Sequence, residues 1–453
     1  MRSGSTSAKE LVAQSLHRIA EIDSSGYTLN SVIALSPDAG QTPTIDPQFP
    51  LAGLPVLIKD NIEAIGLPGS AGSLAFANYP VKKDSSIVSR LRAAGAEIIG
   101  ATNLSEWANI RSTKSTSGWS GLGGLTANPW VHERSAGGSS SGSGAAISAG
   151  LVSLAVGTET DGSIICPASL NGCVGIKPSV GSVPRDGVIP ISASQDSPGS
   201  MARTVKDAVL LLEILMGRSD LLSSVEAERK LKIGVVKSWV TGDSGTDLLF
   251  ENATDLLSKS GISLVDIDLL PPDDATGTDE YEVMLHELKD DLANYLKHRG
   301  DQNFASLEDV IRFNLENSEK ELSFFGQELF ERAILLGGRT NEYAAKRARN
   351  LAWATGTLDK GFESVDVLIG ATYSPAWVSA LGKGDDYAHS SWITMAPAIV
   401  GSPIGSLPMG LTDGLPVGLG IVTRKNDEAT LVQAMRLVEQ VLGLGILEPT
   451  FLK

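Results

Sequence analysis

The feature that most constrains this fold is a repeated order of amphipathic helix, glycine and short apolar strand. Residues 84–95 ("DSSIVSRLRAAG") have helical periodicity and end in glycine, and residues 96–102 ("AEIIGAT") have the apolar character of a buried strand. The same order returns at residues 146–160 and between residues 204 and 236. Strands separated by helices usually pair in parallel, because each helix carries the chain back across the sheet. The sequence therefore predicts an α/β fold with a central twisted mixed sheet, largely parallel, covered by helices on both faces.

The 453 residues are expected to form one large domain, residues 1–453, since no stretch has the character of an interdomain linker. Residues 270–350, approximately, differ from the rest: charges are dense, glycine and proline become rare, and helical periodicity dominates. We interpret this segment as a helical insertion that packs beside the core and forms part of the substrate pocket wall. Strand-like segments resume at residues 365–374 and 418–423, and residues 427–443 form a final amphipathic helix.

Composition excludes several classes of protein. The formal net charge of −16 argues against a nucleic-acid partner, which needs concentrated Lys and Arg. Two cysteines, Cys166 and Cys173, do not make a disulfide framework, and five scattered histidines give no metal-binding spacing. We therefore expect no metal and no cofactor.

No apolar run approaches the roughly 20 residues of a transmembrane helix, and the first residues lack the pattern of a signal peptide. The expected location is the cytoplasm, with a trimmed leader left open. The expected partner is a small molecule rather than a membrane or nucleic acid, and the expected assembly is a monomer or a homodimer.

Lys59 is the first candidate for chemistry, because it closes the short apolar run of residues 56–58. A lysine at a strand end often extends its ammonium group to solvent, which would leave it without a catalytic role. If the amine is buried instead, desolvation lowers its pKa and lets it act as a general base near neutral pH.

The stretch "SAGGSSSGSGAA", residues 135–146, has the composition of a flexible linker. However, it leads directly into apolar residues at the density of a buried helix. A Gly/Ser loop that enters a buried helix points backbone N–H groups at whatever lies before it, and glycine lets the backbone approach a ligand closely. The stretch is therefore either a linker or a folded loop at a site.

Residues 157–167 ("GTETDGSIICP") form a polar turn after a strand ("LVSLAV") that ends at Gly157. Ser163 is in a plausible position for a nucleophile, and the backbone N–H groups before it could form an anion-binding nest. The alternative is an ordinary β-turn.

Ser140 is the centre of "GSSSG", which formally fits the nucleophile elbow G-x-S-x-G. That motif needs a strand immediately before it, and "WVHERSA" has little strand character. We do not favour an α/β-hydrolase elbow here.

Taken together, these segments resemble the amidase signature family over nearly the whole chain, most weakly at residues 220–350. The segments that carry the resemblance are "GLPVLIKDNI", "GGSSSGSGAA", "GTETDGSIICPASLNGCVGIKP", "DSPGSMARTVKDAVLLL" and "GLPVGLGIV". "TNLSEWAN" and "GVIPISASQDSPG" are most similar to the bacterial peptide amidase branch.

The resemblance implies a Ser–cisSer–Lys triad. Ser163 takes the place of the nucleophile, Ser139 that of the bridging serine after a cis peptide bond from Gly138, and Lys59 that of the base. A serine hydroxyl needs an adjacent base, and Ser139 can accept and donate a proton at once. The implied oxyanion hole consists of the N–H groups of Thr160, Asp161, Gly162 and Ser163, with Ser140 and Gly138 as supporting residues. The expected substrate pocket includes Trp107, Ala108, Asn109 and Gln195.

This chain departs from the usual family pattern at three positions near the nucleophile: Glu159, Asp161 and Ile165 replace the frequent Asp, Gly and Arg. Asp161 keeps its backbone N–H, so the predicted anion nest is retained. Ile165 removes a positive charge, which favours uncharged substrates over small anionic ones.

The leading hypothesis is a serine hydrolase that cleaves C–N bonds of peptide, aryl or alkyl amides through an acyl-enzyme, with esterase activity left open. The first alternative is a carbamate (urethane) hydrolase of the same family. An amidotransferase subunit is disfavoured by the acidity and by the segments similar to peptide amidases. A binding protein without catalysis is disfavoured because all three triad positions are intact.

Overall fold

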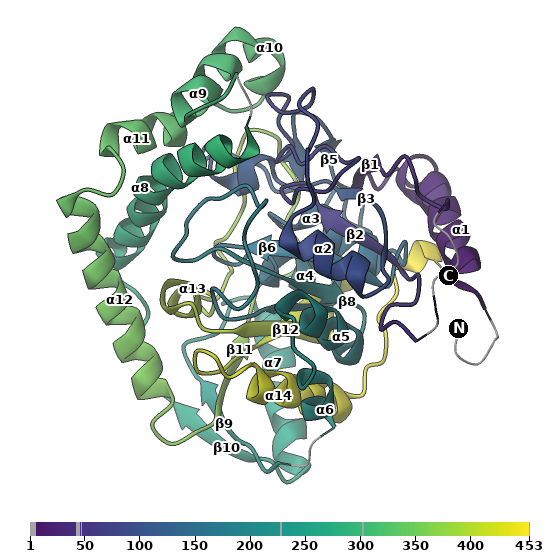
Figure 1. The fold of residues 1–453 in the computed structure, drawn as a ribbon. Coiled ribbons are helices and arrows are strands. Elements are labelled where there is room, and N and C mark those ends of the chain that lie inside the picture. The colour runs from purple at the N-terminus through teal and green to yellow at the C-terminus, as the bar shows by residue number, and fades with distance from the viewer. Residues whose placement is uncertain (1–5, 42–45, 47, 227–228, 301–302, 453) are drawn as a thin grey trace.

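The computed structural model describes residues 6–41, 46, 48–226, 229–300 and 303–452 (Figure 1). A central sheet runs through the molecule with helices packed on either side, and the last described residues, Thr450–Leu452, lie near the first helix, Ala8–Arg18. The strands are β1 Val32–Leu35, β2 Pro55–Lys59, β3 Glu97–Thr102, β4 Trp119–Ser120, β5 Gly124–Leu125, β6 Leu154–Glu159, β7 Val174–Lys177, β8 Ser197–Ala202, β9 Lys232–Val236, β10 Ser263–Ile267, β11 Val367–Ala371, β12 Ile404–Thr412 and β13 Leu415–Val422.

Helices connect and cover these strands. They are α1 Ala8–Arg18, α2 Ser86–Ala93, α3 Ser141–Ser148, α4 Ile165–Asn171, α5 Val205–Met216, α6 Leu221–Val225, α7 Ser244–Lys259, α8 Asp274–Arg299, α9 Leu307–Glu316, α10 Ser318–Glu321, α11 Glu328–Leu336, α12 Asn341–Gly361, α13 Met395–Val400 and α14 Glu428–Leu442. A π-helical turn (Ile19–Asp23) continues α1, and short 3₁₀ turns lie at Glu106–Asn109 and Thr450–Leu452.

The main sheet has eleven strands in the order β1-β3-β2-β6-β8-β7-β12-β13-β11-β9-β10, and β4 and β5 form a separate pair. The predicted mixed α/β sheet is thus confirmed. Parallel pairing occurs in two blocks, β3-β2-β6 and β11-β9-β10.

The middle of the sheet is antiparallel, which differs from the largely parallel pairing expected there. One reason is the direct β12–β13 connection: Asp413 and Gly414 adopt positive φ in a tight turn, and a hairpin must be antiparallel. The other is β8, which inserts between β6 and β7 and runs opposite to both. The Asp413-Gly414 dipeptide is a hairpin signal that the sequence contains, whereas the insertion of β8 between β6 and β7 has no signal in local periodicity.

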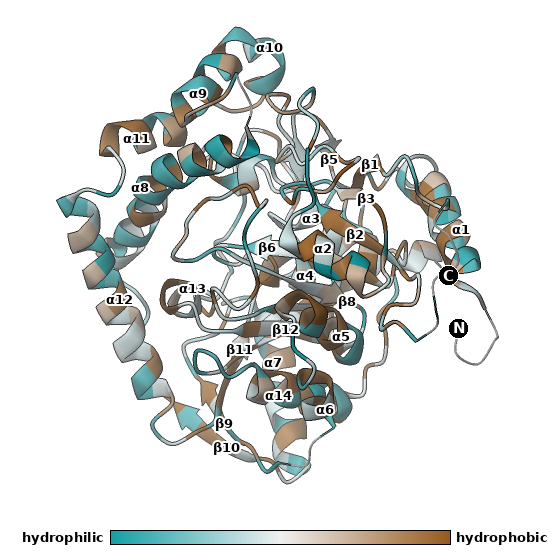
Figure 2. Ribbon diagram, in the orientation of Figure 1, coloured by the Kyte–Doolittle hydropathy of each residue, from teal (hydrophilic) through white to brown (hydrophobic). Residues whose placement is uncertain are grey.

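Helices on both faces are confirmed, and strand residues alternate between the two cores. Val56 and Ile58 of β2 pack into a core shared with α2, α5, α7 and α14. Leu57, between them, faces a second core with residues of α1, α3 and α4. Figure 2 shows the result as apolar strands and an apolar α5 at the centre, with mixed polarity on the outer helices.

Helices α8 to α12 form the left-hand edge of the molecule in Figure 1, where the helical insertion was expected. Helices α8, α9 and α11 share an apolar core with residues 71–76, 107–110 and 189–191, and it includes Phe76, Leu288, Phe304 and Phe330. None of the helices that the structure describes has the length and apolar run that a bilayer crossing requires.

Candidate active site

Lys59 is the last residue of β2 and is completely buried. Its Nζ donates to Ser139 Oγ at 2.8 Å, to Thr158 Oγ1 at 2.9 Å and to the Thr158 carbonyl at 3.2 Å. Burial lowers the pKa of Lys59 to about 7, against the opposing charges of Asp196 and Glu159, which raise it. An amine in this state can take up a proton at neutral pH, and its neighbour is a hydroxyl that can supply one.

The Gly/Ser stretch is a folded loop rather than a linker, and it ends in α3. The peptide bond between Gly138 and Ser139 is cis, as the family resemblance implied. A side chain at Gly138 would meet the hydroxyls of Ser105 and Ser117, so glycine is required there. All residues from Ser139 to Ala149 are buried, which brings the start of α3 against the ends of β2 and β6.

Ser140 is bound on both sides by the backbone of β6. Its hydroxyl donates to the Thr158 carbonyl at 3.0 Å and accepts from the Thr158 N–H at 3.1 Å. A hydroxyl used in this way supports structure, and no strand precedes it in residues 129–138 as an elbow would need. The supporting role of Ser140 in catalysis stays a prediction.

Ser163 lies in the turn between β6 and α4 and is partly exposed. Strand β6 continues to Glu159, two residues beyond the predicted end at Gly157, because Thr158 and Glu159 pair with Pro198 and Ser197 of β8. The Ser163 carbonyl accepts from the Ser140 N–H at 3.1 Å, which fixes the nucleophile candidate beside the Ser139–Ser140 loop.

The turn before Ser163 presents unused backbone donors. Within the described ranges, the N–H groups of Asp161, Gly162 and Ser163 form no hydrogen bond. Gly162 has a φ of +76°, and a side chain there would meet the Tyr373 hydroxyl. Consecutive free N–H groups in a turn with positive φ are the geometry of an anion-binding nest.

Glu159 fixes the end of this turn through hydrogen bonds to the start of α4. Its Oε2 accepts from the N–H groups of Ile164 at 2.7 Å and Ile165 at 3.0 Å, which are the first orphan donors of α4. Burial raises the pKa of Glu159, while the positive charge of Lys177 lowers it. Ile165 itself is fully buried among apolar residues, so it carries no charge toward the site.

Asp196 connects the turn to a loop that precedes β8. It accepts from the Thr160 hydroxyl at 2.6 Å and from the backbone N–H groups of Ile191 and Ser192, each at 2.9 Å. Burial raises its pKa to about 6. The carboxylate therefore fixes Thr160 relative to the 191–196 loop.

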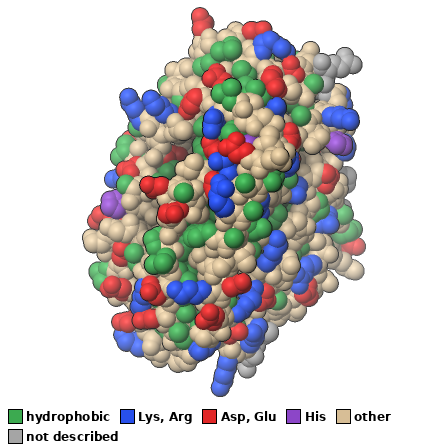
Figure 3. All heavy atoms as spheres, turned by 90° about the vertical axis from the view of Figure 1, so that its left-hand side faces the viewer, with side chains coloured by type: hydrophobic (Ala, Val, Ile, Leu, Met, Phe, Trp, Pro, Cys, Tyr) green, Lys and Arg blue, Asp and Glu red, His purple; other side chains and the backbone are tan. Residues whose placement is uncertain are grey.

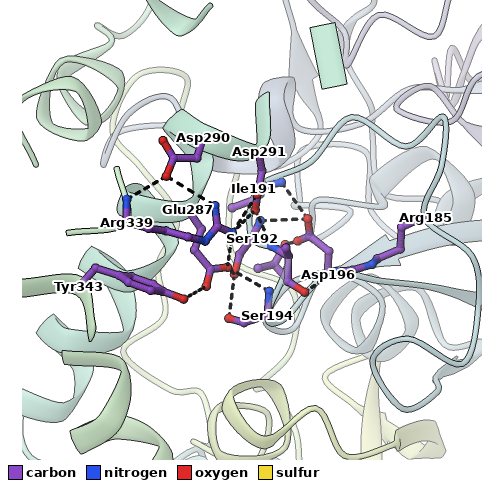
Figure 4. A network of polar contacts seen from close by, with 12 residues as sticks. Arg185, Ile191, Ser192, Ser194, Asp196, Glu287, Asp290, Asp291, Arg339 and Tyr343 are labelled. Carbon is purple, nitrogen blue, oxygen red and sulfur yellow. Dashed lines mark hydrogen bonds and ion pairs between the residues drawn. The ribbon is translucent and has the colours of Figure 1, made fainter. Parts of the chain in front are cut away.

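Helix α8 holds the same loop from the other side (Figure 4). Glu287 accepts from the Ser192 hydroxyl at 2.6 Å and the Ser194 N–H at 2.9 Å, and Asp291 accepts from the Ala193 N–H at 2.8 Å. The insertion is thus coupled to the turn through a short chain of hydrogen bonds.

The predicted pocket residues are not all in one place. Trp107 is buried against Phe76 and Phe330, in the core of the insertion. Ala108 lines a cavity of about 340 Å³ next to Lys59. Asn109 donates to the Ser117 hydroxyl at 3.1 Å.

Gln195 is also buried, and its Nε2 donates to Glu280 Oε1 of α8 at 3.0 Å. Glu280 lies against the Asp161 carboxylate, and burial together with the Asp161 charge raises the pKa of Glu280 well above its usual value. The insertion lines the cavity through the C-terminal half of α8, while residues 310–345 do not line it.

Several residues of the site were not predicted: Asn61, Thr158, Glu159, Asp196, Glu287 and Lys177. Glu159 was noted only as a departure from the family pattern. The sequence position of two of them could have pointed to the site. Asn61 follows Lys59 by two positions, and Lys177 ends β7 as Lys59 ends β2. The remaining contacts join segments far apart in the sequence.

Side chains that could bind a metal are dispersed. In the described part of the chain, no three His, Cys, Asp or Glu side chains gather as metal ligands would. Cys166 and Cys173 are both free and buried.

Comparison with known proteins identifies the class that this fold and site define. The family model described as Amidase matches residues 10–432. The chain therefore belongs to the amidase signature family.

Particular relatives fall into two groups. The native peptide amidase of Stenotrophomonas maltophilia superposes with a TM-score of 0.89 at 36% identity, covering 99% of this chain and 96% of that one. A probable amidase of Arabidopsis thaliana is 38% identical over 73% of this chain and 69% of its own length. A glutamyl-tRNA(Gln) amidotransferase subunit of Methanococcoides burtonii is 32% identical over 95% of this chain and 93% of its own length.

Proposed function

We propose that this amidase cleaves amide C–N bonds with Ser163 as nucleophile, Ser139 as proton relay and Lys59 as base. The observation that carries the proposal is the 2.8 Å hydrogen bond between a buried Lys59 Nζ and Ser139 Oγ. Within the described residues the Ser163 hydroxyl forms no hydrogen bond, so its proton transfer to Ser139 belongs to the proposal.

In the proposed reaction, neutral Lys59 takes the Ser139 proton while Ser139 takes that of Ser163. The Ser163 oxygen then bonds to the substrate carbonyl carbon, and the developing negative charge on the carbonyl oxygen meets the N–H groups of residues 160–163. Each donor of such a hole contributes about 10²–10³ in rate in other hydrolases. The same relay returns the proton to the leaving nitrogen as the C–N bond breaks, and water then hydrolyses the ester on Ser163.

The substrate we favour is a linear amide such as a peptide amide. Support comes from the similarity to peptide amidase over nearly all of both chains. Aryl or alkyl amides, carbamates and esters would follow the same chemistry and differ in the groups that the site accommodates.

A second candidate is a subunit of an amidotransferase, which is favoured by the names of many curated relatives. Seven relatives at 29–33% identity are glutamyl-tRNA(Gln) amidotransferase subunits. The two candidate functions differ in whether activity requires partner subunits. A hydrolase is active as an isolated chain, whereas one component of a larger assembly depends on its partners.

The decisive experiment measures kcat/KM of the isolated chain on a peptide amide, an anilide, an aryl carbamate, an ester and free glutamine. We expect the peptide amide or the anilide to be hydrolysed best. Turnover of glutamine alone, and only after partner subunits are added, would favour the second candidate.

A fluorophosphonate probe should label Ser163, and Ser163→Ala should abolish both labelling and turnover with the fold retained. Labelling at Ser140 would contradict the assignment. Appreciable acyl-enzyme formation by Ser163→Ala would do the same.

A further inference from the structure

A cavity of about 340 Å³ lies on the Lys59 side of the proposed site and is separate from Ser163 and Ser139, which do not line it. This volume is typical of a pocket for a small organic ligand. Its inner end is formed by Asn61, Thr158, Thr160 and Asp196. Two of these residues contact the relay or the turn directly: Thr158 hydrogen-bonds to Lys59, and Thr160 begins the predicted oxyanion hole.

The inner end is rich in hydrogen-bond acceptors. Asn61 is 3% exposed; its Nδ2 donates to Thr158 Oγ1 at 2.9 Å, and its Oδ1 is buried without a partner within the described residues. The Thr160 hydroxyl donates its proton to Asp196 and keeps its lone pairs free. A buried acceptor without a partner is costly, so this end of the cavity is suited to a ligand that donates N–H groups.

One side of the cavity is apolar, the buried ion pair of Glu63 and Arg299 together with Tyr295 also lines it, and the rim carries charges of both signs. Val188, Ile189, Pro190, Ile191 and Pro198 form one side. The rim contains both basic and acidic side chains, namely Lys83, Arg185, His298, Asp186 and Asp291. It therefore favours neither a positively nor a negatively charged ligand. The face built by the insertion likewise mixes acidic, basic and apolar side chains (Figure 3).

The wall is fixed before any ligand arrives. Ile191 and Ala193 belong to the loop that Asp196 binds from the core and Asp291 binds from α8 (Figure 4). Because hydrogen bonds hold this loop on two sides, it loses little conformational entropy when a ligand binds.

We infer that this cavity binds the amine half of the substrate, as a primary aryl or alkyl amine with an apolar body and N–H donors. The inference rests on the function proposed above. When the C–N bond breaks, a proton passes from Lys59 through Ser139 to the leaving nitrogen, so the amine must depart on the side of the relay. Thr158, which hydrogen-bonds to Lys59, also lines this cavity, so a substituent on the leaving nitrogen can extend from the relay into it. There the apolar side of the cavity matches an aromatic or aliphatic body, and the inner acceptors match N–H groups that the body carries.

The test compares two substrates with the same acyl group, N-acetylphenylalanine amide and N-acetylphenylalanine anilide. Ala193 lines the cavity and is partly exposed, so Ala193→Phe extends a ring into the space where the aniline would bind. We expect kcat/KM for the anilide to fall at least tenfold and kcat/KM for the primary amide, which releases ammonia, to change less than threefold. Ala293→Phe is the matched control, because Ala293 of α8 is also partly exposed and does not line the cavity.

Aniline itself gives a second readout that needs no variant. In the wild-type protein it should inhibit anilide hydrolysis competitively. With the primary amide as acyl donor it should attack the ester on Ser163, forming the anilide and freeing the serine. Ala193→Phe should weaken both effects about tenfold.

Equal losses on the two substrates, no loss on either, or wild-type protein that aniline neither inhibits nor uses as an acceptor would each overturn the inference. Those outcomes still include hydrolysis of the primary amide. If the wild-type protein hydrolyses no amide at all, the proposed function fails instead.

Discussion

Two buried lysines end two strands of the same sheet, and their surroundings differ. Lys59 closes β2 and Lys177 closes β7, and both side chains are inaccessible to solvent. Burial lowers the pKa of Lys59 to about 7 and that of Lys177 to about 8. Desolvation alone therefore does not distinguish a base from a structural amine.

The hydrogen-bond partner makes the difference. Lys59 donates to the hydroxyl of Ser139, which has a proton to give. Lys177 donates to the backbone carbonyl of Ser402 at 2.6 Å, which has no proton to give, and the charges of Glu159 and Asp161 raise its pKa against the effect of burial. We therefore expect a buried lysine to act as a base where its hydrogen-bond acceptor is also a proton donor, and as an electrostatic support where that acceptor is a backbone carbonyl.

The largest expected effect separates the two lysines directly. Lys59→Met should lower kcat/KM about 10³-fold or more, as expected when a member of a catalytic unit is removed. Lys177→Met should lower it less than tenfold. Steady-state kinetics on one amide substrate, with circular dichroism to verify folding, measure both, and equal losses would remove the distinction.

The pH profile of the wild-type protein should give the next largest effect. Because only neutral Lys59 accepts a proton, kcat/KM should rise about tenfold per pH unit below pH 7 and level off above it. Lys177→Met should keep this profile. A flat profile between pH 5 and 8 would mean that Lys59 is not the titrating base.

A smaller effect, a shift of the pH profile of kcat/KM, is expected from Asp196→Asn. The Asp196 charge raises the pKa of Lys59, so its removal should move the acid limb of the profile to lower pH. At pH 6 the variant should then retain a severalfold larger fraction of its own plateau activity than the wild type does. Asp274→Asn, at an exposed position in the first turn of α8, is the control and should leave the limb in place; an upward shift in Asp196→Asn would contradict the account.

The smallest effect concerns stability. Between pH 8 and about 10.4, unfolded Lys177 binds a proton that the folded residue does not, so the free energy of unfolding should rise with pH over this window. Urea titrations at several pH values should show a shallower rise for Lys177→Met than for the wild type. An unchanged slope would indicate that Lys177 keeps its proton when folded.

The sequence predicted the parts of the site that rest on local pattern. The apolar run of residues 56–58 and its terminal lysine, the helix after the Gly/Ser stretch and the turn at Ser163 lie where expected. Each depends on hydrogen bonds within a few residues or on the periodicity of buried positions. The roles of Ser163, Ser139 and Lys59 came from resemblance and stay predictions.

The contacts that the sequence did not predict are long-range. Asp196 meets Thr160 across 36 positions, and Ser192 meets Glu287 across 95. Such pairs depend on how β8 inserts into the sheet and on where the insertion packs, and neither has a signal in local periodicity. For the same reason the insertion of β8 and the cavity beside Lys59 were not foreseen.

The hydrogen bonds from Thr160 through Asp196 and Ser192 to Glu287 also restrict how this protein can change over evolutionary time. Residues of α9 to α11 can be exchanged without disturbing the turn at Ser163, because among the described residues no hydrogen bond joins those helices to it. Positions on the face of α8 that carries Glu287 and Asp291 have no such freedom. Change should therefore accumulate in the outer helices without altering the site, while the inner face of α8 is kept as its foundation.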